Sequence, residues 1–151
     1  MKAAYSIVVA MAGVLAVSAA SAQRGAPNPE RTAVQQLIQS FATHVQSGNL
    51  TAIDSLFRPR GVHILTDTAT THGWAEYRDQ HLKPEIARYT NLKFEHSAVE
   101  AQVRDSVAWV AFRQTVGGTT PAGPAQSIGR GTAVLEKTGG KWVIVHLHVS
   151  R

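Results

Sequence analysis

The sequence predicts an α+β fold in which helices pack on one face of a curved, mostly antiparallel sheet. In the first part of the chain, apolar residues recur every three or four positions, which is the spacing of amphipathic helices. From Leu92 onward, apolar and polar residues alternate, which is the spacing of strands. Helices followed by consecutive strands, with no internal repeat, indicate an α+β domain rather than alternating βα units.

The beginning of the chain has the features of a secretory signal peptide. Lys2 precedes an apolar run that ends near Val17, and small residues follow up to Ala20-x-Ala22. Cleavage before Gln23 would divide the 151 residues into a signal peptide (1–22), a polar linker (23–29) and one domain (30–151). We therefore expect a periplasmic or secreted protein that has no membrane association after signal cleavage.

Asn28 as N-cap and Pro29 at the first helical position predict the start of the first helix, and Gly48 predicts its end. A shorter helix over 50–57 stops before Pro59. The apolar stripe of the first helix consists of Val34, Leu37, Ile38, Phe41, Ala42 and Val45.

A short strand over 62–66 and a Thr-rich turn lead to a third helix over 73–82, which Pro84 breaks or kinks. Strands over 92–103, 107–116, 127–137 and 142–150 complete the prediction, with a loop over 117–124. Thr138-Gly139-Gly140 is a strong hairpin turn between the last two strands.

Composition excludes several classes of protein. The chain has no cysteine, which excludes disulfides, thiolate metal sites and cysteine nucleophiles. Lys and Arg total 15 against 10 Asp and Glu, but the cations are scattered singly and form no basic run. We therefore expect no nucleic-acid partner.

Three stretches carry a resemblance to a known family: Gly48-Asn49-Leu50-x-x-Ile53-x-x-Leu56-Phe57, Gly73 at a helix start, and Gly140-Lys141-Trp142-x-Ile144-x-His146-x-His148-x-Ser150. The chain resembles the nuclear transport factor 2-like superfamily over about 31–151, and within it the SnoaL-like and ketosteroid-isomerase-like proteins. Its last ten residues are also similar to the association domain of calcium/calmodulin-dependent protein kinase II. The resemblance implies a cone of three helices closed by a strongly bent sheet, with a small-molecule pocket at its mouth and a dimeric assembly.

The ketosteroid isomerase chemistry itself is not expected. When the chain is laid on that family's pattern, the oxyanion-hole tyrosine falls at Phe41, the general base at Leu65 and the protonated carboxylic acid at Ala133. Asp67 lies two residues from the general-base position, so a small register shift could bring it in. Phe, Leu and Ala can neither move a proton nor stabilise an oxyanion.

The same comparisons indicate which residues face the pocket. The kinase association domain matches Arg113, Tyr77 and His81 to pocket positions, and strand alternation adds His63, which shares a face with Leu65. Arg113 either pairs with Asp67 or Glu85 or holds an anionic ligand, because a buried guanidinium needs a partner. We thus predict catalytic candidates His63, Tyr77 and His81, and ligand-binding candidates Arg113, Phe41, Leu65, Trp109 and Val145.

His146-x-His148 is the motif that most resembles a metal site, but alternation puts both histidines on the face opposite Val145. With Trp142 and Ile144 they would form the outer sheet face, where we expect a two-fold homodimer interface. We therefore predict no metal and no cofactor.

Two functions remain open. The first is an exported acid–base enzyme (isomerase, lyase or hydrolase) acting on a small, partly apolar or anionic substrate. The second is a non-catalytic ligand-binding or dimerisation module with the same pocket, and a histidine metal site is a more distant third.

Overall fold

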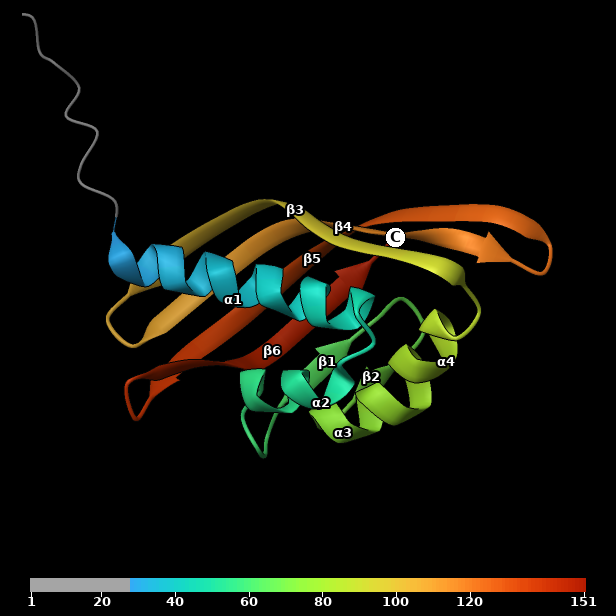
Figure 1. The fold of residues 1–151 in the computed structure, drawn as a ribbon. Helices are drawn as coiled ribbons and strands as arrows, with labels where there is room; N and C mark the ends of the chain where they lie inside the picture. The colour runs from blue at the N-terminus through green and yellow to red at the C-terminus, as the bar shows by residue number, and fades with distance from the viewer. Residues whose placement is uncertain (1–27) are drawn as a thin grey trace, which may run out of the picture.

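The computed structural model describes residues 28–151, so the proposed signal peptide and most of the linker lie outside the described residues. Helices and a mixed six-stranded sheet of order β2-β1-β6-β5-β4-β3 form the fold (Figure 1). The elements are α1 (Pro29–Gln46), α2 (Leu50–Ile53), β1 (His63–Leu65), β2 (Thr70–Thr71), α3 (Trp74–Tyr77), α4 (Lys83–Ile86), β3 (Thr90–Arg104), β4 (Val107–Thr120), β5 (Gly123–Thr138) and β6 (Lys141–Ser150).

Helix α1 forms as its sequence predicts. The Asn28 side chain accepts hydrogen bonds from the backbone N–H groups of Glu30 and Arg31, and Gly48 adopts a positive φ of 71° just beyond the helix end. The predicted stripe faces the sheet, and Val34, Ile38, Phe41, Ala42 and Val45 are buried. Leu37 packs against this core while remaining partly exposed.

The third predicted helix continues past Pro84 rather than ending before it. A regular α-helix would bring the Pro84 ring against the Gln80 carbonyl. A π-helical turn over Arg78–Leu82 joins α3 to α4 instead, and in it the Lys83 N–H reaches the Arg78 carbonyl. The proline thus distorts the helix, which then runs on to Ile86.

The sheet is mostly antiparallel, as expected, but β1 runs parallel to β6. The predicted Thr-rich turn contains β2, which pairs with β1. The predicted loop over 117–124 is wrong for the most part. Thr120 pairs with Gly123, so β4 and β5 form one long hairpin with a two-residue turn, which projects beyond the helices (Figure 1).

The core lies between the helices and the concave face of the sheet. Phe41 is its centre: its ring is stacked on His96 at 5.5 Å between centroids and meets Phe57, Trp74 and Phe94 edge-on. Glu30 ties the start of α1 to the last hairpin, because its carboxylate accepts from Lys137 Nζ at 2.6 Å and from Trp142 Nε1 at 2.7 Å.

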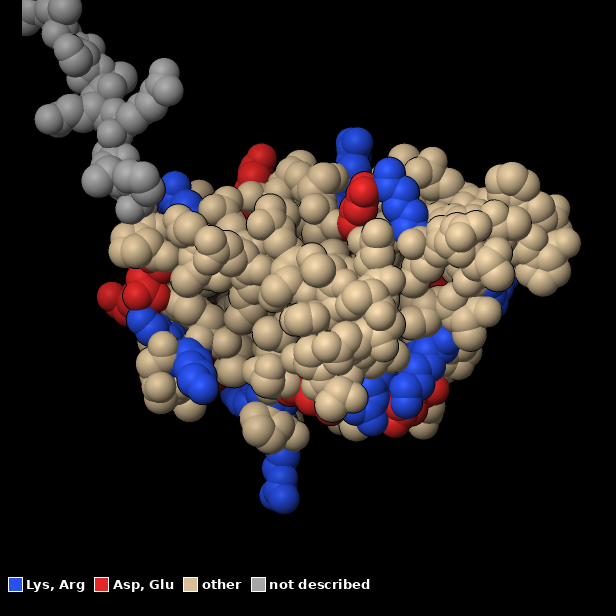
Figure 2. All heavy atoms as spheres, viewed as in Figure 1, with Lys and Arg blue, Asp and Glu red and all other residues tan. Residues whose placement is uncertain are grey.

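Charged residues gather around the rim of the face seen in Figure 2, where Lys and Arg alternate with Asp and Glu around an uncharged centre. Within residues 28–151, no helix is long and apolar enough to cross a membrane.

Candidate functional site

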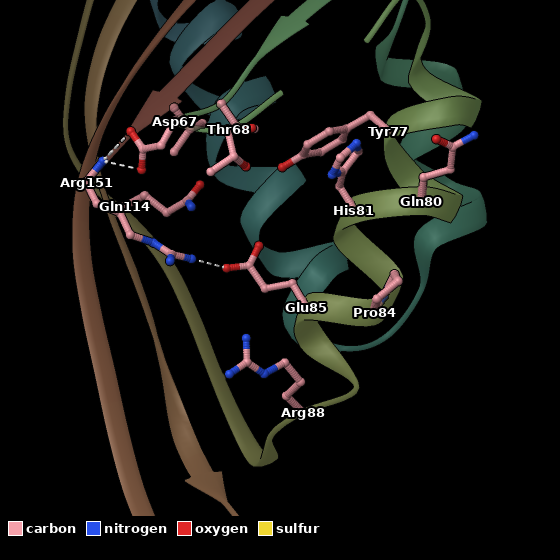
Figure 3. Close-up of a pocket in the computed structure, with 12 residues that line it drawn as sticks. Asp67, Thr68, Tyr77, Gln80, His81, Pro84, Glu85, Arg88, Gln114 and Arg151 are labelled. Carbon is pink, nitrogen blue, oxygen red and sulfur yellow. Dashed lines mark hydrogen bonds and ion pairs between the residues drawn. The ribbon is translucent and has the colours of Figure 1, made fainter. Parts of the chain in front are cut away.

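A pocket of about 330 Å³ lies between the α3–α4 segment and the end of the sheet (Figure 3). Most of its walls are polar, with carboxylates, guanidinium groups, amides and hydroxyls among them. It is lined by Thr66, Asp67, Thr68, Tyr77, Gln80, His81, Pro84, Glu85, Arg88, Gln114, Val149 and Arg151.

Tyr77 presents its hydroxyl to this pocket from the helical wall (Figure 3). The residue is only 6% exposed, and within residues 28–151 its hydroxyl has no hydrogen-bond partner. Burial raises the pKa of Tyr77, and the negative charge of Glu85 raises it further, whereas Arg151 opposes them. The hydroxyl therefore stays protonated near neutral pH and is available as a hydrogen-bond donor.

His81 stands beside Tyr77, with ring centroids 6.0 Å apart and ring planes 22° from parallel. Its imidazole supplies a group that can accept a proton within the same cavity. The arrangement follows from the helix, since residues four apart lie on one side of it.

Two further pocket residues follow along this segment, Glu85 on α4 and Arg88 just beyond the helix end at Ile86. Tyr77, His81, Glu85 and Arg88 are spaced by four, four and three residues, which is a helical period. Sequence reasoning did not extend this period because Pro84 was expected to break or kink the helix. Arg88 was thereby missed as a pocket residue, and Glu85 was considered only as a partner for Arg113.

Asp67 and Arg151 form the sheet-side wall. The Arg151 backbone N–H donates to both carboxylate oxygens of Asp67, at 3.2 and 3.1 Å, and its guanidinium forms an ion pair with Glu85 across the pocket. This contact spans from the end of the sheet to α4 (Figure 3). Arg88, by contrast, forms no ion pair with any residue in 28–151, so its guanidinium is free to meet an anion.

Gln114 is the one amide on the sheet-side wall, and it connects the pocket to the core. Its side-chain oxygen Oε1 lies 3.2 Å from Nε2 of His96, whose Nδ1 lies 2.9 Å from the Ile38 carbonyl oxygen. Burial lowers the pKa of His96, although these two hydrogen bonds oppose the effect. His96 was missed at the sequence level, where nothing marked it as different from any other strand residue.

The expected pocket positions of Arg113 and Trp109 are wrong. On β4 the residues that face the core are Ala108, Val110 and Phe112, so the odd-numbered residues face outward. Trp109 is 48% exposed, and Arg113 is exposed on the same face. Arg113 was placed by the resemblance to the kinase association domain, and Trp109 was placed with it because the two share a face of the strand. Both faces of this strand carry apolar residues, so alternation did not reveal the error.

Val145 is also misplaced by the sequence analysis, because β6 contains a β-bulge. Leu135 pairs with Ile144 while Val134 pairs with His146, which leaves Val145 as the extra residue. The bulge reverses the alternation, so Trp142 and Ile144 face the core and not the outer surface. His146 and His148 remain on the outer face as expected.

The other candidates also lie outside the pocket. His63 pairs with His146 and Leu65 with His148, so both lie on the outer face of the sheet. Phe41 is buried in the core and does not reach the pocket wall. Of the eight candidates, the structure brings only Tyr77 and His81 to the pocket.

Histidines gather on the outer face of the sheet. His63 lies beside His72 with ring centroids 5.2 Å apart, and it neighbours His146 across the β1–β6 pair. Burial lowers the pKa of His146, and His148 and His63 add to the effect. In the described part of the chain, no three His or carboxylate residues are arranged to hold a metal ion.

Comparisons with known proteins agree with this architecture. A protein of the nuclear transport factor 2-like superfamily from Salmonella enterica serovar Typhimurium is 17% identical and superposes with a TM-score of 0.68 over 79% of this chain and 91% of its own. A candidate ketosteroid isomerase from Shewanella frigidimarina is 21% identical, with a TM-score of 0.67 over 76% of this chain and 92% of its own.

A candidate calcium/calmodulin-dependent protein kinase II association domain from Xanthomonas campestris is similar too. It is 22% identical, with a TM-score of 0.64 over 78% of this chain and 84% of its own. At these identities the likeness establishes the fold, and the fold hosts many functions. The sequence has no significant match among curated proteins. The model of the SnoaL-like domain matches residues 34–151, and the chain therefore belongs to the SnoaL-like domain family.

Proposed function

We propose that this protein binds a small polar anion in the Tyr77 pocket and performs acid–base chemistry on it. The observation that carries the proposal is the Tyr77 hydroxyl, which has no hydrogen-bond partner in residues 28–151 and points into a cavity beside an imidazole, while the residue as a whole is 6% exposed. Because the hydroxyl opens to the cavity, an oxygen of a bound ligand can accept a hydrogen bond from it.

Tyr77 and His81 have complementary roles in this proposal. The raised pKa of Tyr77 keeps its proton in place, so the hydroxyl donates to an oxygen on which negative charge develops. His81 accepts a proton from a neighbouring carbon or hydroxyl. His63 has no part in this chemistry because it lies on the outer face.

Arg88 is the anchor for the anionic end of the ligand. It lines the pocket and has no acidic partner in residues 28–151, unlike Arg151, which is paired with Glu85. A guanidinium recognises a carboxylate through two parallel hydrogen bonds. We assign to Arg88 the role that the sequence suggested for Arg113.

The test uses a panel of small 2-keto and 2-hydroxy acids. We expect at least one to bind by calorimetry, and a bound keto acid to exchange the hydrogens on C3, next to its keto carbon, with D₂O faster than in buffer, as followed by NMR. Tyr77→Phe should keep the fold and slow the exchange by about 10²–10⁴-fold. Binding without exchange would favour the non-catalytic binding module. If none of the acids binds and no exchange is seen, the proposal is overturned.

Two arginines provide a matched control for the anchor. Arg88→Met removes a guanidinium from the pocket, whereas Arg113→Met removes one from the outer face, and neither side chain is ion-paired within residues 28–151. We expect Arg88→Met to weaken carboxylate binding by about tenfold or more and Arg113→Met to leave it unchanged. Equal effects of the two changes would contradict the role of Arg88.

We also propose that the outer face of the sheet is a homodimer interface. Its support is that three large apolar side chains are exposed on this face: Val107 (40%), Trp109 (48%) and Ile128 (56%). An isologous contact between two such faces would cover them. Light scattering that finds a monomer at tens of micromolar would refute this.

Export is the remaining part of the proposal, and it rests on residues 1–22. The apolar run and Ala20-x-Ala22 support cleavage before Gln23 and a periplasmic or secreted location. Mass spectrometry of the mature protein should give a chain that begins at Gln23, and an intact Met1 in an exported fraction would contradict it.

A further inference from the structure

His96 is partly buried, titratable and not used by the proposed chemistry. It lies on β3 beneath α1, among the rings of Phe41, Phe94 and Phe112, with centroids 4.3–5.6 Å away. Both of its ring nitrogens have a partner: Nδ1 lies 2.9 Å from the Ile38 carbonyl oxygen, and Nε2 lies 3.2 Å from Oε1 of Gln114. Because Gln114 also lines the pocket, His96 is connected to the site through one side chain.

The two contacts together determine the tautomer of a neutral imidazole. A main-chain carbonyl oxygen can only accept a hydrogen bond, so the proton must be on Nδ1, where it is donated to Ile38. Nε2 is then without a proton and can only accept. Its partner must therefore be a donor.

Gln114 can supply that donor because its amide has two ends of the same shape. A half-turn about the last side-chain bond exchanges the oxygen and the NH₂ group, and the neighbouring group decides which end it faces. A bare Nε2 requires the NH₂ group, so the amide must be turned by half from the recorded contact, in which Oε1 is the nearer atom, and its carbonyl oxygen then faces the other side. That side is the pocket, into which Gln114 extends from the sheet (Figure 3).

The neutral state is the one that the surroundings of His96 favour. Aromatic rings from α1, β3 and β4 surround it, and no carboxylate in residues 28–151 is bonded to either nitrogen. Gln39, Thr43, Gln46 and Glu95 line the groove on its other side, and Glu95 is paired with Lys93. A charged imidazole would lack a counter-ion there, which is costly in a buried site.

We propose that His96 is a positioning residue that turns the Gln114 amide so that its carbonyl oxygen faces the pocket, and that the pocket therefore takes a hydroxyl or N–H group of the ligand at this point. This inference rests on the proposed function for the existence of a ligand. It adds a specificity rule, because a bound molecule must donate a hydrogen bond to Gln114 while its anionic end meets Arg88.

The first test is spectroscopic and needs no ligand. ¹⁵N NMR of the imidazole at pH 7.5 should find His96 neutral, with the proton on Nδ1 and a bare Nε2. A proton on Nε2, whether in the other tautomer or in the cation, would overturn the proposal, since Gln114 would then turn its oxygen to His96. This result would leave the proposed acid–base chemistry of Tyr77 and His81 untouched.

Two matched variants probe the contact itself. Gln114→Glu offers only oxygens to Nε2, so we expect it to raise the pKa of His96 and to populate the doubly protonated ring at neutral pH. Gln80→Glu adds the same charge to the same pocket from the opposite wall, and it should leave the His96 signals as in the wild type. Equal shifts in the two variants would show a general charge effect and refute the specific coupling.

The specificity rule is tested with lactate and pyruvate, which differ at one position by a donor hydroxyl and an acceptor carbonyl. We expect wild-type protein to prefer lactate by about tenfold. His96→Asn keeps a donor for Ile38 but does not reach Gln114, so the preference should disappear while both acids still bind. Retention of the full preference in this variant would contradict the rule, and failure of both acids to bind the wild type would count against the proposed function instead.

Discussion

Gly131 is the position at which one added methyl group should disturb both the core and the site. It lies on the core face of β5 opposite Phe112 of β4, and the Phe112 ring covers it. A Cβ atom at this glycine would lie 2.2, 2.3 and 2.8 Å from three ring atoms of Phe112, whereas ordinary contacts are 3.4–4 Å. The ring cannot move freely, because Phe112 is 4% exposed and its centroid is 4.3 Å from that of His96.

Gly131→Ala should therefore destabilise the protein. Overpacking of this kind costs about 1–3 kcal/mol, and alanine recovers about 0.5–1 kcal/mol of backbone entropy, so we expect a net loss of about 1–2 kcal/mol. For a domain of this size that corresponds to a fall in Tm of roughly 3–10 °C. Urea denaturation should show a lower midpoint with an unchanged m value.

Controls separate the ring contact from a general effect of substitution in β5. Thr132→Ala changes the adjacent, outward-facing residue and should stay within about 0.5 kcal/mol of the wild type. In a double-mutant cycle, Phe112→Leu should relieve part of the Gly131→Ala cost. If Gly131→Ala unfolds within about 0.5 kcal/mol of the wild type, the close packing of Phe112 on this glycine is wrong.

Three further outcomes follow from the structure. Arg113→Met should leave Tm nearly unchanged, because the guanidinium is exposed and has no acidic partner in residues 28–151; a large fall would contradict its outward placement. Stability should decline as the pH falls below 6.5, the ordinary pKa of histidine, because the folded-state pKa of His96 is lower and the unfolded chain binds the proton more readily. His96→Asn should lose less stability than the wild type between pH 7 and pH 5, and an equal loss would point to other groups. Trp109→Ser should raise the dimer dissociation constant in sedimentation experiments, and an unchanged constant would remove Trp109 from the interface.

Local sequence signals were sufficient for the helical part of the fold. Asn28, Pro29 and Gly48 bound the first helix through interactions with their own neighbours, so their effect could be recognised from the sequence. The hairpin at Gly139 and Gly140 is equally local, since both residues adopt positive φ angles of 57° and 79°. Such signals act over a few residues and are independent of the rest of the fold.

Part of the site could be predicted through the resemblance to the kinase association domain, which pointed to Tyr77 and His81. Their four-residue spacing puts them on one side of the helix, and Glu85 and Arg88 follow at similar spacing once the helix is known to pass Pro84. The residues of the opposite, sheet-side wall of the pocket could be identified only from the tertiary structure. Asp67 and Arg151 are 84 positions apart in the chain and meet through their hydrogen bonds at the end of the sheet.

The sequence by itself determined the order of helices and strands, because periodicity and capping are local properties, and its motifs carried the resemblance to the family and to pocket positions at Tyr77 and His81. Only the tertiary structure decided which face of each strand is buried. On β4 both faces carry apolar residues, and on β6 the bulge at Val145 reverses the alternation, so Arg113, Trp109 and Val145 were assigned to the pocket in error. The link from His96 through Gln114 to the pocket joins two strands and a helix, and it arises only when they pack together.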